Sequence, residues 1–316
     1  MKNNISPNTG MIARKNSIWN KAWKQRGLIL MSLPFIIYVI VFKYIPIWGW
    51  ILAFQNYSPA KGIFEQTWVG LENFRMLFQD SMFFQVLRNT LAMSLIKLIS
   101  GMFFSILLAL MLNEVRNLIF KKFTQTISYL PYFISWVVAA SLALNILSVE
   151  GIINDVLMLF NLIEKPIMFM GRPGLFWWII GATHVWKTIG YGAILYLASM
   201  TSISPSLYEA ATIDGASRLQ RIWYVTLPGI KPVIIILLIM SIGQLMNDGF
   251  EQIYLMMNQR VVNYARVFTI FELDYGLKMM RYSFATAVGI FRSIVSLVLV
   301  FGANYIAKCM GEERLI

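Results

Sequence analysis

Three cations stand inside stretches of this sequence that are otherwise apolar, and they are the residues most able to do chemistry there. Lys97, Lys187 and Arg292 each interrupt a hydrophobic run long enough to cross a membrane. A cation at the centre of a lipid-facing helix costs at least ~2.5 kcal/mol, so each side chain should face a protein interior or a wet cavity. We expect no acidic residue at the same depth on this chain.

Two of these cations, Lys187 and Arg292, could act together on a ligand. If both face one cavity, they make a desolvated positive site for carboxylates, because Coulomb attraction strengthens as the local dielectric falls. Two plainer interpretations stay open. An acid on a partner chain could neutralise either cation, or each cation could hydrogen-bond the carbonyls of a broken helix. We expect Lys97 to be structural.

Polar and aromatic side chains recur at helical spacing in the same runs. One set lies within a single helix face at about 100° per residue: Trp177, His184, Lys187 and Tyr191. A second set follows the i, i+3, i+4, i+7 pattern: Gln244, Asn247, Asp248 and Glu251. Such groups can bind the hydroxyls and C–H faces of a carbohydrate in a wet cavity, or they can join helices by hydrogen bonds. With aromatic surface added near Tyr132, we predict a ligand pathway lined by Trp136, Lys187, Tyr191, Gln244, Asn247 and Arg292.

The sequence lacks the patterns on which most enzymes depend. It has one histidine, His184, one cysteine, Cys309, and no phosphate-binding GxxxxGK[ST] loop. No paired carboxylates and no nucleophile with a neighbouring base appear on the apolar runs. We therefore expect no catalytic residue, no metal site and no cofactor bound by this chain. A lone histidine is more often a packing residue than a ligand, and we interpret His184 in that way.

The elements that must position these residues are membrane-spanning helices. The chain has 316 residues, of which 58% are hydrophobic and 13% charged, whereas a soluble domain is nearer half apolar and a quarter charged. We predict an all-α membrane protein with six transmembrane helices, near residues 28–50, 86–111, 127–148, 175–200, 232–250 and 284–307. Lys43 and Pro46 interrupt the first of these and could end it early.

The charges between the apolar runs indicate the orientation. Residues 1–27 form a basic tail without acids, and apolar residues recur in it at helical spacing from Ile18 to Trp23, as in an interfacial helix on an anionic leaflet. With this tail in the cytoplasm, the inner segments 112–126 and 201–231 are denser in Lys and Arg than the outer ones, as the positive-inside rule requires. Both termini are then cytoplasmic. The net charge of +12 is explained by topology, and no nucleic-acid partner is indicated.

One loop between apolar runs carries its own helix signals, over residues 204–232. Ser206 stands three residues before Glu209, the spacing of a capping box, and Pro205 suits the first helical position. Gly215 is placed to end that helix, since glycine takes the left-handed conformation without steric cost. A basic amphipathic segment follows until Pro228 and Pro232 are expected to break it. We predict two small helices with alanines at the tip, suited to docking into a groove on another protein.

The residues of this loop resemble a known motif. The spacing of Glu209, Ala210, Ala211, Gly215 and the Leu227-Pro228 pair is similar to the EAA loop of bacterial ABC-importer permeases. The fuller pattern resembles the carbohydrate-uptake branch and adds Tyr208, Asp214 and Ala216. The stretches 42–59, 107–117, 125–138 and 249–256 resemble oligosaccharide and polysaccharide permeases that work with a lipoprotein receptor. The resemblance covers nearly the whole chain.

The resemblance implies a type I permease fold with a cytoplasmic EAA coupling helix, in a bacterial cell membrane. It implies a permease domain over 28–310, between the tail 1–27 and a short cytoplasmic end at 311–316. The implied partners are a second, homologous permease, two ATPases that hold ATP and Mg, and an extracytoplasmic sugar-binding lipoprotein. The cargo would be an oligosaccharide, with acidic uronides as one possibility. Two other interpretations stay open: an ion-coupled secondary sugar transporter, and a membrane enzyme such as a glycosyltransferase.

Overall fold

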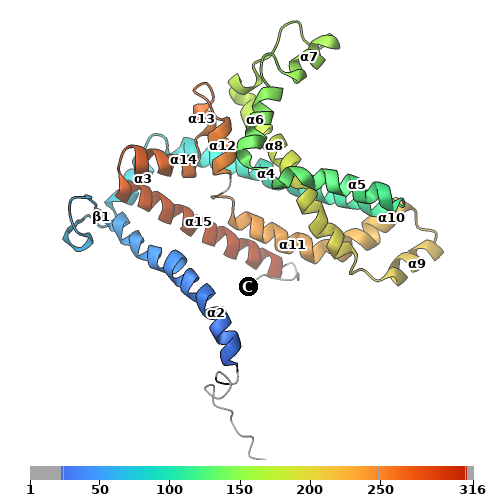
Figure 1. Ribbon diagram of the computed structural model, residues 1–316, viewed down its shortest axis with the longest axis horizontal. Helices are drawn as coiled ribbons and strands as arrows, with labels where there is room; N and C mark the ends of the chain where they lie inside the picture. The colour runs from blue at the N-terminus through green and yellow to red at the C-terminus, as the bar shows by residue number, and fades with distance from the viewer. Residues whose placement is uncertain (1–22, 24, 248, 310, 312–316) are drawn as a thin grey trace, which may run out of the picture. The chain divides into compact units, whose positions relative to one another are not determined.

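The computed structural model describes residues 23, 25–247, 249–309 and 311, and most of them are helical (Figure 1). The predicted interfacial helix near 18–23 and the end 311–316 lie almost wholly outside the described residues. The chain divides into two compact units, Met1–Ile51 and Leu52–Ile316.

The described part of the first unit is one apolar helical segment whose hydrogen-bonding pattern changes along its length. It runs as α2 (Arg26–Val39), then the π-helix η1 (Ile40–Tyr44), then the 3-10 helix η2 (Ile45–Phe54) that leads into the second unit. The interruption predicted at Lys43 and Pro46 is therefore a change of helix type, since proline removes one backbone donor and the wider π turn accommodates the loss. The helical segment extends over 29 residues, from Arg26 to Phe54.

The second unit contains a two-stranded antiparallel pair, β1 (Gln55–Asn56) and β2 (Thr67–Trp68), and otherwise helices. Short η3 (Ile63–Glu65) lies between the strands. The helices up to the middle of the chain are α3 (Glu72–Gln79), α4 (Phe83–Glu114), α5 (Leu118–Tyr129), η4 (Leu130–Phe133), α6 (Trp136–Ile146), α7 (Ile152–Leu159) and η5 (Phe169–Gly171). Those that follow are α8 (Pro173–Met200), α9 (Pro205–Ile213), α10 (Arg218–Arg221), η6 (Ile222–Thr226), α11 (Leu227–Gly243), α12 (Phe250–Met256), α13 (Val262–Ala265), α14 (Phe268–Leu273), η7 (Asp274–Lys278) and α15 (Tyr282–Cys309).

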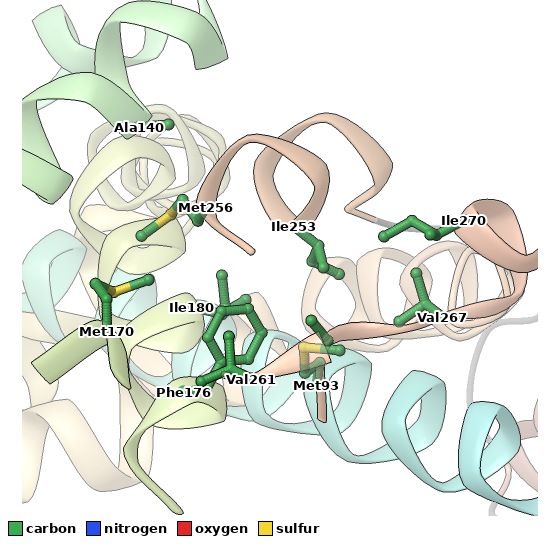
Figure 2. Packing of buried hydrophobic residues seen from close by; sticks show 11 residues of the cluster. Met93, Ala140, Met170, Phe176, Ile180, Ile253, Met256, Val261, Val267 and Ile270 are labelled. Carbon is green, nitrogen blue, oxygen red and sulfur yellow. The ribbon is translucent and has the colours of Figure 1, made fainter. Parts of the chain in front are cut away.

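Packing in this unit centres on α4 and α8, which contact each other along much of their length. Figure 1 shows α11 and α15 side by side. The largest buried apolar cluster joins α4, α6 and α8 to the segment that contains α12 to α14, with Met93, Phe176, Ile180 and Ile253 among its members (Figure 2). A second cluster packs Leu77 and Phe83 against Phe271 and Phe284, so that α3, α4, α14 and α15 meet there.

Among the described residues, four helical segments are long and apolar enough to cross a membrane, or five if a bent pair counts as one span. They begin at Arg26, Phe83, Arg218 and Tyr282. The bent pair replaces the single helix predicted over 127–148: the segments Leu118–Phe133 and Trp136–Ile146 meet at 104°. The fourth predicted span, 175–200, coincides with α8 (Pro173–Met200), which is not one of these segments. The count of six stays a prediction.

The fifth predicted span differs most from expectation. A continuous helical segment runs from Arg218 to Gly243, so Pro228 and Pro232 do not break it. Pro228 lies in the first turn of α11, where a missing N–H costs little, and the π turn of η6 precedes it. The helix also ends at Gly243 rather than near 250: residues 244–247 form turns, and Gly249 has a φ of +90°. Gln244, Asn247 and Glu251 therefore do not share one helix face, and Asp248 lies outside the described residues.

The segment between α11 and α15 is fastened to the ends of other helices by polar side chains. Asn89, fully buried on α4, donates from Nδ2 to the carbonyls of Asn263 and Arg266. Tyr275 Oη donates to Asp80 Oδ2 over 2.6 Å. Burial and this hydrogen bond raise the pKa of Tyr275 to about 12, so the phenol stays a donor at neutral pH.

Candidate functional site

A cavity of about 450 Å³ opens between α4, η4, α8 and α11. The α4 wall is made of Ser94, Lys97, Leu98, Gly101, Met102 and Ser105. The α8 wall is made of His184, Thr188, Tyr191, Gly192, Leu195 and Tyr196. Tyr132 of η4 closes one side, and Leu237, Met240, Ser241, Gln244 and Leu245 close another. The volume lies in the range of small-molecule pockets, and the lining combines aromatic rings with hydroxyl and amide groups.

A lysine from α8 stabilises the bend between η4 and α6. Lys187 is 6% exposed, and its Nζ donates to the carbonyl of Tyr132 over 2.8 Å and to that of Pro131 over 3.3 Å. These carbonyls lie at the end of a helical turn, where the helix dipole favours a cation. The same ammonium lies 5.3 Å from the ring of Trp136. A side chain of the neighbouring helix α8 therefore supplies the hydrogen-bond donor that the carbonyls at the bend need.

Two aromatic pairs flank this lysine. The rings of Tyr132 and Tyr191 are stacked at 4.2 Å with an interplanar angle of 6°. Those of Trp136 and His184 are nearly parallel at 6.3 Å and 13°. Both pairs join the bent span to α8, and Tyr132, Tyr191 and His184 line the cavity.

The turn after α11 is held from α4. Ser94 Oγ donates to the carbonyl of Leu245 over 2.7 Å. Lys97, 2% exposed, places its Nζ where a side chain on Gly249 would stand. The cavity thus lies between two interruptions of apolar helices, each contacted by a buried lysine of an uninterrupted helix. Irregular backbone at membrane depth is tolerated where it is buried in protein or lines a cavity.

The structure separates the predicted pathway residues into three groups. Tyr191 and Gln244 line the cavity. Trp136 and Lys187 lie in the layer that contacts its lining. Asn247 lies at the turn after α11, with Nδ2 3.5 Å from Ser296 Oγ, and Arg292 lies on α15. Contact between any of them and a substrate stays a prediction.

Arg292 corrects two expectations. Its Nη1 donates to Glu272 Oε2 over 2.8 Å, so an acid does lie at its depth on this chain. The sequence did not indicate this acid, because Glu272 comes from α14, outside the apolar runs. Lys187 and Arg292 also do not form one positive site: the first bonds backbone carbonyls, the second a carboxylate, and neither lines the cavity.

Several lining residues were missed by sequence reasoning. Ser94, Gly101 and Ser105 belong to one stripe of α4 with Lys97, and Ser241 lies on α11. His184, interpreted as a packing residue, lines the cavity as well as stacking on Trp136. The recurrence of serine, lysine and glycine every three or four residues along 94–105 was the available signal.

The loop predicted to dock on a partner forms a short exposed helix, α9 (Pro205–Ile213). Pro205 is its first residue as expected, but Ser204 occupies the N-cap, and Ser206 bonds the Ser204 hydroxyl rather than forming a capping box with Glu209. A capping box does form three residues before Gln220, at Ser217. Gly215 ends the turn with a φ of +78°. Within the described residues, the exposed Glu209 carboxylate has no hydrogen bond or ion pair.

The helix α9 contacts the long helical segment Arg218–Gly243, whose far end reaches the cavity. Tyr208 Oη lies 3.0 Å from the hydroxyl of Thr226, which is 1% exposed. Arg221 Nη1 donates to Thr212 Oγ1 over 3.2 Å. The helix is continuous from Arg218 to Gly243, and it therefore links the contact at Thr226 to Ser241 in the cavity wall.

Comparison with known proteins gives concordant matches. Residues 101–310 match the family model described as "Binding-protein-dependent transport system inner membrane component". The polygalacturonan/rhamnogalacturonan transport system permease protein YteP of Bacillus subtilis is 44% identical over 93% of this chain and 92% of its own. Protein LplB of the same organism is 40% identical over 96% of each chain. A chain of a bacterial alginate ABC transporter, solved in complex with an alginate pentasaccharide-bound periplasmic protein, is 36% identical with a TM-score of 0.86, over 94% of this chain and 99% of that one.

Proposed function

This chain belongs to the family of binding-protein-dependent transport system inner membrane components, and on that premise we propose that it imports oligosaccharides released from acidic polysaccharides. It is a multi-pass permease of a sugar ABC importer and not itself an enzyme. Family membership sets aside the ion-coupled carrier and the glycosyltransferase.

The observation that carries the proposal is the lining of the cavity. Tyr132 and Tyr191 offer flat apolar rings, and Ser241 and Gln244 offer a hydroxyl and an amide on another wall. Sugars present apolar C–H faces and many hydroxyl groups, so they match a wall of aromatic rings with a few placed polar groups. The acidity of the cargo is supported by the relatives, whose names refer to polygalacturonan, rhamnogalacturonan and alginate. The proposed acidity of the cargo does not depend on Lys187 and Arg292, because these two cations do not form one positive site.

The geometry of the coupling helix supports a mechanism. Two cytoplasmic ATPases would dock on α9 of this chain and on its counterpart in a second, homologous permease, with Glu209 as polar anchor and Ala210 and Ala211 permitting close approach. Through its contact with Thr226, Tyr208 would make α9 move together with the helical segment Arg218–Gly243. The remaining motif residues, Asp214, Gly215, Ala216, Leu227 and Pro228, would shape the turn and the start of α11. A sugar-binding lipoprotein would deliver the cargo outside.

The test is uptake by the complete complex, offered an acidic and a neutral oligosaccharide of equal length. We expect uptake of the acidic sugar to depend on ATP and to exceed that of the neutral one. Glu209→Lys should abolish uptake, because it reverses the charge presented to the ATPase, while Tyr208→Phe should lower it severalfold because only the brace is lost. Leu219→Ala, an exposed neighbour outside the motif, is the control. Full uptake in Glu209→Lys with the ATPases still bound would contradict the coupling role.

A further inference from the structure

The stacked tyrosines are an unusual surface inside the cavity. Tyr132 is 38% and Tyr191 43% exposed although their rings are in face-to-face contact. Each ring covers one face of the other, and the Lys187 ammonium lies over the Tyr132 ring, so only part of each ring is left to the cavity. Both residues line it together with Gln244 and Ser241. The pair comes from two elements, η4 and α8, so it exists only while the bent span stays in register with α8.

Lys187 connects α8 to the backbone of η4 and so contributes to the position of Tyr132 relative to Tyr191. It lies one helical turn before Tyr191 on α8, and its ammonium binds the backbone of Tyr132 at 2.8 Å and lies 5.4 Å from the centre of the Tyr132 ring. Without this donor, two carbonyls at the bend would lose their partner in a weakly polar surrounding. The bend would then be free to move Tyr132 away from Tyr191.

We propose that Tyr132 and Tyr191 form a stacking subsite for one pyranose ring of the cargo, and that Lys187 is the positioning residue that holds Tyr132 in it. The inference rests on the proposed function and names the part of the cavity that recognises the sugar. The subsite binds the C–H face of the ring, and it therefore accepts neutral and acidic pyranoses alike. Selection for acidic cargo belongs elsewhere in the transporter.

The experiment uses the assembled permease and ATPase complex in nanodiscs, titrated with a uronic-acid oligosaccharide and followed by calorimetry. Tyr132→Leu and Tyr191→Leu should each weaken binding about threefold to tenfold, the size expected of one aromatic contact. Tyr191→Phe keeps the ring and should stay within about twofold of wild type. Met111→Leu, at an exposed position of α4 away from the cavity lining, is the matched control.

The role of Lys187 is tested by a double-mutant cycle. Lys187→Met should weaken binding as much as Tyr132→Leu does, and it should cause no further loss in the Tyr132→Leu background, because both act through the same ring. Lys187→Arg keeps a donor and should recover part of the affinity. Additive losses would assign Lys187 to general stability and overturn its positioning role. If the Lys187 variants do not assemble, the tyrosine variants still decide the subsite.

The outcomes separate the two proposals. Wild-type affinity in both leucine variants, with ATP-dependent uptake intact, overturns the subsite and leaves the proposed function standing. The same holds if wild-type complex transports the sugar but binds none in the titration. If wild-type complex transports no oligosaccharide, the proposed function falls and the subsite falls with it.

Discussion

At the scale of single residues, the charged groups inside the apolar helices each find a different partner. Lys187 binds carbonyls at a bend, Lys97 lies against the turn at Gly249, and Arg292 binds a carboxylate. All three face protein, as the cost of a lipid-facing cation requires. Because these partners come from other elements, a cation in an apolar run indicates an interior position without indicating what it contacts.

The Arg292–Glu272 pair leads to a prediction about stability. Its side chains are 16% and 23% exposed, and Glu272 Oε1 and Arg292 Nε are buried without a hydrogen-bond partner among the described residues. Arg292→Met should lower the free energy of unfolding by about 3–5 kcal/mol, because it leaves a carboxylate without its counter-charge. The double variant Arg292→Met with Glu272→Met should regain most of that loss. Thermal denaturation of the purified permease measures both, and a double variant no more stable than the single one would count against the pair as the cause.

At the scale of elements, the cavity is bounded by interrupted helices supported by uninterrupted ones. The helical segment that α5 begins is bent after Phe133, and α11 ends at Gly243, whereas α4 and α8 are uninterrupted helices that supply the lysines. This arrangement places backbone turns in the cavity wall while keeping their polar groups satisfied. It also needs α5 and α8 to lie very close together.

Gly190 is the point where α8 and α5 meet most closely. A Cβ there would collide with the backbone of Ser128 and Tyr129, which cannot turn away as a side chain can. Gly190→Ala should therefore destabilise the permease by about 1–3 kcal/mol or prevent α5 from packing. Gly302→Ala, exposed on α15 with no atom near the added methyl group, should change stability by less than about 1 kcal/mol. Equal melting temperatures for the two variants would show that the helices approach less closely than the structure indicates.

At the scale of the whole molecule, the chain consists of a separate apolar segment and a larger helical unit. The helix α2 has no buried residue of its own. The exposed α9 is the surface on which we propose that an ATPase docks, in keeping with the ABC-importer family to which the chain belongs.

The orientation of that assembly can be tested on the intact chain. Cysteines placed at Asn117 and Ser217 in a Cys309→Ser background should resist an impermeant thiol reagent in whole cells, whereas one at Asn263 should react. The reason is the density of Lys and Arg in the segments that hold the first two positions. Permeabilised cells, in which all exposed sites react, are the control. Labelling at Ser217 from outside would place α9 away from the ATPases.

The features that could be predicted from the sequence are those set by residues close together along the chain. Hydrophobic length located the apolar helices, Pro205 and Gly215 set the ends of α9, and the motif around Glu209 indicated the family, since each of these signals lies within a few neighbouring residues. Tertiary structure decided the rest: the bend at residues 134–135, the end of α11 at Gly243, the carbonyls that Lys187 binds and the carboxylate that Arg292 binds. These features depend on contacts between elements distant in sequence. The periodicity of one helix does not show where that helix ends when side chains of another helix stabilise the turn that follows it.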